Sequence, residues 1–374
     1  MSEWNLRDEL IHLNHAAVGP WPQRTKIAIN QFVEENVTQG SLNYLQWVRI
    51  ERELKQNLQQ LINAKRLTEI ALLKNTSEAL SVVAYGLAWK SGDNIVISNQ
   101  EFPSNTIVWE SLKPKGVEVR YADLYSAETP EQALCELCDE NTKLLSISSV
   151  QYATGLKMDC EQLGKFCRNN DILFCIDAIQ SIGAEAFDVQ KNLADFVVAD
   201  GHKWMLGPEG VALFYCREDV MDQLSLTQYG WHMVENYLDY DDKHWELAKS
   251  ARRFECGSPN MLGIHGLNAS ASLLLEVGMP QVVEQLQDNV SFLINEISQL
   301  PQYRIKSDQN LERRSGIVSF ELENRPTEEL FEHLKTNNIF CAMRAKRIRF
   351  SPHYYTEKLK LHRTIQILRE FDKN

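Results

Sequence analysis

Seven short apolar runs alternate with helix-like patterns through the middle of the chain, and this alternation limits the possible fold more than any other feature. The runs lie near residues 70–74, 94–98, 117–121, 143–149, 172–177, 196–199 and 211–215. Such alternation is typical of βαβ units and a mainly parallel sheet. Because the runs are apolar almost throughout, helices such as those expected at 77–89 and 160–170 should cover both faces. The sequence therefore predicts an α/β domain built on a large, seven-stranded, mainly parallel sheet.

The pattern changes after Asn260, where longer helical segments replace the alternation. The clearest helix is expected at 281–300, followed by a strand at 316–322 and a final helix at 356–371. A chain of 374 residues also exceeds the size at which one hydrophobic core keeps growing. We therefore expect a large α/β domain at 15–260 and a smaller α+β domain made of 1–14 and 261–374.

Charge and composition argue against several classes of partner. The net charge of −12 and the pI near 5.3 disfavour nucleic acid or an anionic membrane. No run is long and apolar enough to cross a bilayer, and the polar first residues lack the features of a secretory signal, so we expect a cytoplasmic protein. Cys135 and Cys138 have no second pair or nearby histidines, so no metal site is expected.

A carboxylate and a lysine follow two consecutive apolar runs. Asp177 ends the run at 172–177, and Lys203 comes shortly after the run at 196–199. Ligands of parallel α/β sheets bind beyond the carboxyl ends of the strands. Pyridoxal 5'-phosphate (PLP) needs an amine that forms a Schiff base and a carboxylate that keeps its pyridine nitrogen protonated, and Lys203 and Asp177 meet both needs. A surface lysine and a helix-capping aspartate would give the same spacing.

Two longer segments resemble a known family. The stretch 177–183 reads DAIQSIG, and the stretch 199–210 reads ADGHKWMLGPEG. Both are similar to the signature motifs of the class V aminotransferases, which include cysteine desulfurases, selenocysteine lyases, isopenicillin N epimerase-like proteins and kynureninases. The similarity extends over almost the whole chain, from 13–17 to 349–352. It implies a PLP-dependent transferase fold of the aspartate aminotransferase type (fold type I), with PLP as the cofactor.

The resemblance assigns roles to individual residues around the cofactor. Lys203 corresponds to the lysine that holds PLP as a Schiff base and moves protons. Asp177 corresponds to the partner of the pyridine nitrogen, and Gln180 to the donor at the phenolic oxygen. His202 resembles the family histidine near the phosphate, although a histidine bonded within the fold would look the same. Ser258 resembles the position that reaches the phosphate of the neighbouring subunit, which implies a homodimer.

Three further residues are expected to hold the cofactor. Thr76 and Ser77 stand where a helix is expected to begin, and free N–H groups and hydroxyls at a helix N-terminus form a phosphate site. Phe102 follows the second predicted strand and can stack on the ring, although a phenylalanine after a strand is often part of the core. Asp200 would repel a phosphate, so it either points elsewhere or is compensated by a cation.

The amino acid substrate is expected to contact the smaller domain. Arg349 matches the arginine that family members use to bind the substrate α-carboxylate, a role that suits a planar, two-pronged donor. A solvated basic strand is the other interpretation of Arg349. By the same resemblance, Asn14, His15 and Trp231 look like residues of loops that line the substrate pocket.

The sequence leaves several reactions open. We expect a cysteine or selenocysteine lyase-like or aminotransferase activity at the α- or β-carbon of an amino acid, with Lys203 abstracting the α-proton. Cysteine desulfurases also require a nucleophilic cysteine on a loop before the arginine, and Cys341 stands too early to match it cleanly. An isopenicillin N epimerase-like or kynureninase-like enzyme is the alternative. A non-catalytic scaffold with the same fold is an alternative of another class.

Overall fold

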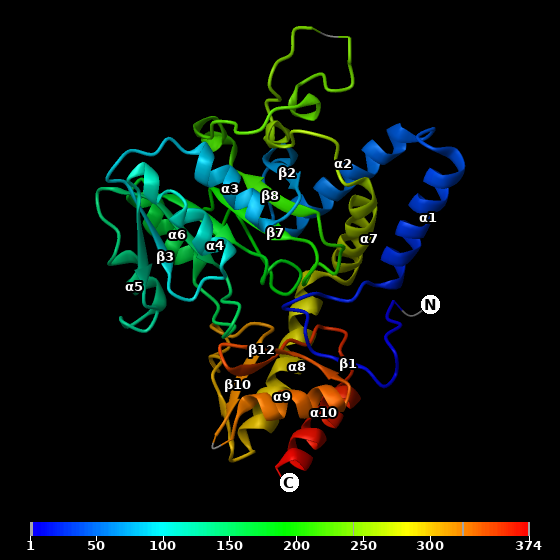
Figure 1. Cartoon of the computed structure of the whole chain (residues 1–374), viewed down its shortest axis with the longest axis vertical. Helices are drawn as coiled ribbons and strands as arrows, with labels where there is room; N and C mark the ends of the chain where they lie inside the picture. Colours follow the sequence, from blue (N-terminus) through cyan, green and yellow to red (C-terminus); the bar gives the residue numbers. More distant parts are fainter. Residues whose placement is uncertain (1–2, 242, 324, 373–374) are drawn as a thin grey trace.

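A sheet of seven strands forms the centre of the larger part of the molecule (Figure 1). The computed structural model describes residues 3–241, 243–323 and 325–372. In spatial order the strands are β2 (Ile70–Leu73), β8 (Ala212–Cys216), β7 (Phe196–Asp200), β6 (Leu173–Asp177), β5 (Thr142–Ser148), β3 (Asn94–Ser98) and β4 (Glu118–Ala122). Neighbours from β7 to β4 pair in parallel, whereas β8 lies antiparallel to both β2 and β7. The predicted seven-stranded, mainly parallel sheet is therefore confirmed.

Helices cover both faces of this sheet, as the apolar character of its strands requires. Val197 and Ala199 of β7 point into one hydrophobic cluster, and Phe196 and Val198 point into another on the opposite face. The first cluster also contains side chains of the helices α2 (Tyr44–Leu61), α5 (Pro130–Cys135), α6 (Cys160–Asn169) and α7 (Met261–Val277). The second contains side chains of α3 (Thr76–Gly86) and α4 (Ser104–Glu110). The rigid sheet between these two clusters carries the residues that follow β6 and β7.

A second, smaller body has its own core. It contains an antiparallel sheet in the order β12 (Ala342–Arg344), β13 (Arg347–Phe350), β10 (Val318–Leu322) and β9 (Tyr303–Ile305). The helices α8 (Met279–Ser298), α9 (Thr327–Thr336) and α10 (Lys358–Phe371) pack on this sheet and supply apolar side chains to a third cluster. The expected helices at 281–300 and 356–371 and the expected strand at 316–322 match α8, α10 and β10 within two residues.

The N-terminal segment joins the smaller body. Strand β1 (Ile11–His12) pairs in parallel with β11 (Ile339–Phe340), and Asn14 forms a bridge with Ser351. Helix α7 packs instead against α1 (Gln23–Gln39) and α2, so its buried side chains belong to the core of the large sheet. The domain boundary after Asn260 stays a prediction. None of the helices in the described ranges combines the length and the apolar character needed to cross a membrane.

A buried charged cluster ties α2 to the segment that projects from the molecule between β8 and α7 (Figure 1). The Nζ of Lys55 lies 2.8 Å from a carboxylate oxygen of Glu51 and 2.8 Å from one of Glu255. The Nδ1 of His232 lies 3.3 Å from Glu255. Glu255 also accepts a hydrogen bond of 2.8 Å from the backbone N–H of Leu72 in β2. Lys55 thus supplies the positive charge that two buried carboxylates need.

Candidate active site

The carboxyl ends of β6 and β7 bring Asp177 and Lys203 together. The two strands are parallel neighbours, and Asp177 lies opposite Val198, so the residues after both strands meet at the same edge of the sheet. A cavity of about 300 Å³ opens there. Eight of the predicted site residues line it: Thr76, Ser77, Phe102, Asp177, Gln180, His202, Lys203 and Arg349. Side chains expected to serve one cofactor and one substrate therefore share one cavity.

The electrostatics of Lys203 and Asp177 are set mainly by burial. Burial lowers the pKa of Lys203; Asp177 opposes this shift, and the positive charge of Arg349 adds to it. Burial raises the pKa of Asp177, while the backbone N–H of Ile179, 3.0 Å from Oδ1, and the Lys203 ammonium oppose that shift. An amine that loses its proton easily is what Schiff-base formation requires. A buried carboxylate beside it is suited to a protonated pyridine nitrogen.

Gln180 and Phe102 are held facing the cavity. The side-chain amide of Gln180 donates to the carbonyl of Ala16 at 3.0 Å and accepts from the indole N–H of Trp204 at 2.8 Å. One amide hydrogen of Gln180 is left for a ligand oxygen. The ring of Phe102 is 42% exposed, which excludes a plain core role, and the Lys203 Nζ lies 5.6 Å from its centroid. Phe102 can therefore stack on a planar ring attached to Lys203.

The N-terminus of α3 forms one end of the cavity. Asn75 caps this helix by accepting from the backbone N–H of Glu78 at 2.9 Å, and Thr76 and Ser77 occupy the first turn. The hydroxyl of Thr76 accepts from the backbone N–H of Asp200 at 3.2 Å. The free N–H groups and hydroxyls of this turn are suited to an anion such as the phosphate of PLP.

Asp200 lies beside this turn, next to the imidazole of His202. Its carboxylate lies 2.9 Å from the Nδ1 of His202, and both side chains are almost buried. Asp200 lines the cavity, and His202 is the residue beside it that could compensate its charge by taking up a proton. His202 also lines the cavity, and the neighbouring carboxylate of Asp200 orients its imidazole ring.

Arg349 reaches the cavity from the smaller body. Its side chain is 1% exposed, and its Nη1 donates to the carbonyl of Tyr152 at 2.7 Å. Its Nε and Nη2 have no hydrogen-bond partner among the described residues. Burial and the nearby Arg344 lower the pKa of this guanidinium. A buried guanidinium with two free donors is a site for a carboxylate, because an anion would restore both the charge balance and the hydrogen bonds.

Four predicted residues lie outside the cavity of their own chain. His15 is fully buried, with its Nδ1 2.9 Å from the Ser351 carbonyl and its Nε2 2.7 Å from the Tyr355 hydroxyl. Asn14, 6% exposed, lies beside it. Both belong to the packing of the N-terminal segment and do not line this cavity, so their expected role in substrate binding stays a prediction. Trp231 and Ser258 lie elsewhere, in contact through a hydrogen bond of 3.4 Å.

Glu101 is the residue near the site that sequence analysis missed. This carboxylate is 8% exposed and accepts hydrogen bonds from Ser98 (2.7 Å), Asn105 (2.7 Å), Gln151 (2.9 Å) and the backbone N–H of Ser148 (3.0 Å). It thereby joins the loop after β3, which carries Phe102, to the end of β5. Nothing in the local sequence distinguishes Glu101 from a solvated glutamate, since all its partners except Ser98 and Asn105 are distant in the chain.

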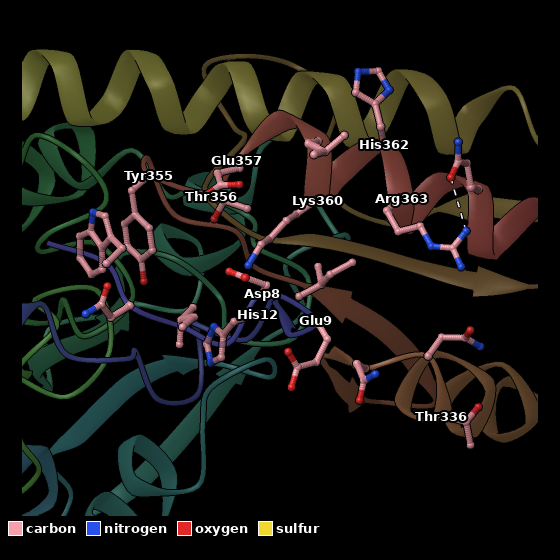
Figure 2. Close-up of a pocket in the computed structure, with 18 residues that line it drawn as sticks. Asp8, Glu9, His12, Thr336, Tyr355, Thr356, Glu357, Lys360, His362 and Arg363 are labelled. Atoms are coloured by element: carbon pink, nitrogen blue, oxygen red, sulfur yellow. Dashed lines mark hydrogen bonds between the residues drawn. The ribbon is translucent and has the colours of Figure 1, made fainter. Parts of the chain in front are cut away.

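A larger hollow of about 890 Å³ lies between the N-terminal segment and α10 (Figure 2). Figure 2 shows Lys360 reaching from α10 toward Asp8, near Glu9 and His12. Its lining mixes both signs of charge, and the Lys360 Nζ already donates to the carbonyl of Leu10 at 2.9 Å. Neither Lys203 nor Asp177 lines this hollow. Size alone therefore does not identify the site, and the smaller cavity remains the candidate.

The smaller cavity has the parts of a PLP site. A buried carboxylate ends one of two adjacent parallel strands, and a buried lysine lies shortly after the end of the other. A glutamine and an aromatic ring face them, and a helix N-terminus can take a phosphate. The fold and the site together define a PLP-dependent enzyme of fold type I.

Comparisons with known proteins identify the family. The family model for class V aminotransferases matches residues 11–345, so the chain belongs to this family and is a PLP-dependent enzyme. A "probable cysteine desulfurase" of Methanothermobacter thermautotrophicus is 30% identical over 90% of this chain and 84% of its own length. A protein of the same description from Pyrococcus abyssi is 30% identical over 84% of this chain and 79% of its own. The predicted family, fold type and cofactor are confirmed.

Solved structures show the same fold. The apo structure of a cysteine desulfurase from Thermococcus onnurineus NA1 superposes with a TM-score of 0.87 at 24% identity, covering 98% of this chain and 95% of its own. A cystine C–S lyase, solved with its product cysteine persulfide, superposes with a TM-score of 0.88 at 21% identity, covering 95% and 96%. The likeness at these identities concerns the fold, and the choice of reaction has to be argued from the site.

Proposed function

We propose that the enzyme breaks the bond between the β-carbon and a sulfur or selenium atom of an amino acid. The observation that carries the proposal is the arrangement of Lys203, Asp177 and Arg349 around one cavity. The relatives at 30% identity are named as cysteine desulfurases, which supports sulfur chemistry. PLP bound there withdraws electrons from the substrate α-carbon and so makes its proton acidic.

The chain's own residues would perform the remaining steps. Arg349 binds the α-carboxylate with its free Nε and Nη2 and so orients the substrate. With the substrate held in this way, the Lys203 amine would take the α-proton, because burial lowers its pKa and so favours the unprotonated form. The β-carbon–sulfur bond then breaks and its electron pair leaves with the sulfur. After the product has left the site, hydrolysis yields a keto acid and ammonia.

Sulfur would leave without being stored on a protein cysteine in this cavity. None of the eight cysteines, all of them in the described ranges, lines it. Cys341 directly follows Phe340, the last residue of β11; it is 5% exposed, and burial raises its pKa to about 12. A buried, protonated thiol is a poor nucleophile. We therefore propose an elimination rather than the formation of an enzyme persulfide.

The test is product analysis of the PLP-loaded protein with L-cysteine, L-cystine and L-selenocysteine. We expect a sulfur or selenium product and pyruvate in equal amounts, and a loss of at least about 10²-fold in Lys203→Ala. Alanine in place of pyruvate would contradict the elimination. Inversion at the α-carbon would indicate an epimerase, and release of an aromatic amine from kynurenine would indicate a kynureninase-like reaction. A protein that takes up no PLP would overturn the proposal and favour the scaffold alternative.

We also propose that the active unit is a homodimer in the cytoplasm, with Ser258 contacting the cofactor phosphate of the other subunit. Ser258 and Trp231 lie away from their own cavity, beside a segment with exposed aromatic side chains such as Trp245, 59% exposed. Hybrid dimers of a Lys203→Ala chain and a Ser258→Ala chain test this. They regain one complete site, and hence activity, if Ser258 acts on the partner, and gain nothing if it acts within its own chain.

A further inference from the structure

The β12–β13 hairpin places three arginines on one face. Arg344 lies directly opposite Arg347, and Arg349 is two residues further along β13. Because side chains alternate along a strand and opposed residues share a face, Arg344, Arg347 and Arg349 point to the same side. The connecting residues Ala345 and Lys346 have φ of 49° and 60°, as in the tight two-residue turns of β-hairpins.

Only one of these arginines has a carboxylate partner within the described part of the chain. Arg347 lies 3.7 Å from Glu321 of β10 and does not line the cavity. Arg344 and Arg349 both line the cavity, and each donates a hydrogen bond to a backbone carbonyl, Arg344 to that of Met343 and Arg349 to that of Tyr152. The substrate side of the cavity therefore carries two guanidinium groups without a counter-charge.

The carboxylates of the cavity do not balance these two charges. The acidic residues that line it are Asp177 and Asp200, at the ends of β6 and β7 on the cofactor side. Asp200 is paired with His202 at 2.9 Å, and Asp177 faces Lys203. Arg344 lies close enough to Arg349 for its positive charge to lower the pKa of Arg349, so the two cations repel one another. An amino acid with one carboxylate would engage Arg349 and leave Arg344 without a counter-charge.

We propose that the substrate carries a second anionic group, a carboxylate or a sulfur oxyacid, that binds Arg344 while Arg349 binds the α-carboxylate. The guanidinium of Arg344 is planar, permanently charged and half-buried, which suits a carboxylate or sulfinate better than a neutral side chain. This inference rests on the proposed function and names its substrate class. Cystine, with a second carboxylate beyond its disulfide, and cysteine sulfinate both have the required charge.

The first test compares amino acids that differ only in charge. L-Aspartate and L-asparagine, and L-glutamate and L-glutamine, are titrated into the PLP-loaded protein, and the half-saturating concentration is read from the visible spectrum. We expect the acids to bind roughly ten- to a hundredfold more tightly than the amides, and Arg344→Gln to remove this preference. Arg344→Lys should retain part of it. Arg347→Gln is the matched control and should behave like the wild type. Equal binding of acid and amide would overturn the inference.

The source of the second anionic group is settled by two further arms of the titration. In one arm, binding of L-cystine is compared with that of S-methyl-L-cysteine, which has a neutral side chain; this arm tests whether a distant carboxylate binds Arg344. In the other arm, binding of L-cysteine sulfinate is compared with that of L-cysteine; this arm tests whether a sulfur oxyacid binds Arg344. A preference in either arm that depends on Arg344 supports the inference and identifies the group. If Arg344→Gln changes binding in neither arm and in neither the aspartate–asparagine nor the glutamate–glutamine pair, the inference is contradicted.

A second test does not depend on the chemistry of the cofactor. Succinate and butyrate have the same carbon skeleton and differ in one carboxylate, and their binding to the PLP-loaded protein is measured by calorimetry. We expect succinate to bind roughly tenfold or more tightly, and Arg344→Gln but not Arg347→Gln to abolish the difference. If succinate is preferred but no amino acid changes the spectrum, the proposed reaction fails and the two-anion site stands. If amino acids react but succinate binds no better than butyrate, the two-anion site fails and the reaction stands.

Discussion

Replacing Lys55 by methionine tests whether the buried cluster around it stabilises the fold. Lys55 is 8% exposed, and its partners Glu51 and Glu255 are 4% and 6% exposed. Burial by itself would lower the pKa of Lys55, but the charges of Glu255 and Glu51 raise it overall, so the amine is held protonated. Methionine keeps the length of the side chain and removes the charge. Two carboxylates would then be buried without a cation, apart from the weaker contact with His232.

The expected destabilisation follows from the loss of one member of a buried ion cluster, which costs about 3–5 kcal/mol. Unfolding entropy is about 2.1 cal/mol/K per residue, which for 374 residues gives roughly 0.8 kcal/mol/K. Lys55→Met should therefore lower Tm by about 4–6 °C if the chain unfolds as one unit. The double variant Glu51→Gln/Lys55→Met should recover part of the loss, because one of the two unpaired charges is gone.

Differential scanning calorimetry at pH 8 and pH 5 measures both effects. The folded pKa of Glu255 is lowered: burial would raise it, but Lys55 and His232 outweigh that effect. The cluster therefore contributes stability above the unfolded pKa of a glutamate that is lost as pH falls. In Lys55→Met the carboxylates can take up protons, so the penalty should be smaller at pH 5 than at pH 8. A Tm within 1 °C of the wild type, or a double variant less stable than the single one, would refute this account.

Three further predictions concern the surroundings of the site. Burial lowers the pKa of His353 to about 4, below the unfolded value of 6.5, so this residue should cost about 1.4 kcal/mol of stability for each unit by which pH drops between those values. His353→Gln should therefore make urea midpoints less dependent on pH between pH 7 and 4.5, while the lowered pKa values of His12 and His15 keep part of the dependence. Glu101→Ala leaves several buried donors without an acceptor and should lower the free energy of unfolding by about 3 kcal/mol or more, whereas unchanged denaturant midpoints would exclude its bridging role. A Cβ on Gly183, at φ 95°, would lie 2.3 Å from the carbonyl oxygen of Trp204, whereas Gly92, at φ 97°, has free space. Gly183→Ala should therefore lower Tm clearly more than Gly92→Ala, which should cost about 1 kcal/mol, and equal losses would argue against the close approach.

Local sequence patterns predicted the sheet, and they predicted several of the residues that line the cavity. The strands are short apolar runs bounded by polar residues, so each of the seven was found within about two residues of its observed bounds. Asp177 and Lys203 could be placed because position after a parallel strand fixes where a residue lies relative to its neighbours. Thr76 and Ser77 were found for a similar reason, since a helix start is a local feature.

Contacts between distant segments were beyond the sequence patterns. His15 has the appearance of a pocket residue until its partners Ser351 and Tyr355, more than 330 positions away, are known. Glu101 is recognisable as buried only when β5 is placed beside β3. Among the described residues Arg344 has no carboxylate partner because Glu321 faces Arg347 instead, and the register of three strands decides which arginine Glu321 faces.

The pairing of β1 with β11 has a consequence for the order of events during synthesis. Ile11 pairs with Ile339, a separation of 339 − 11 = 328 residues. At a translation rate of about 5–20 residues per second, Ile11 waits roughly 16–66 s for its partner to be made. During that interval the large sheet can assemble, because β2 to β8 all lie between the two strands in the chain. Ile11 and Leu13 are both buried in the finished protein, but until then they remain exposed to chaperones. Chaperones should therefore stay bound longest to the segment around Ile11 and Leu13.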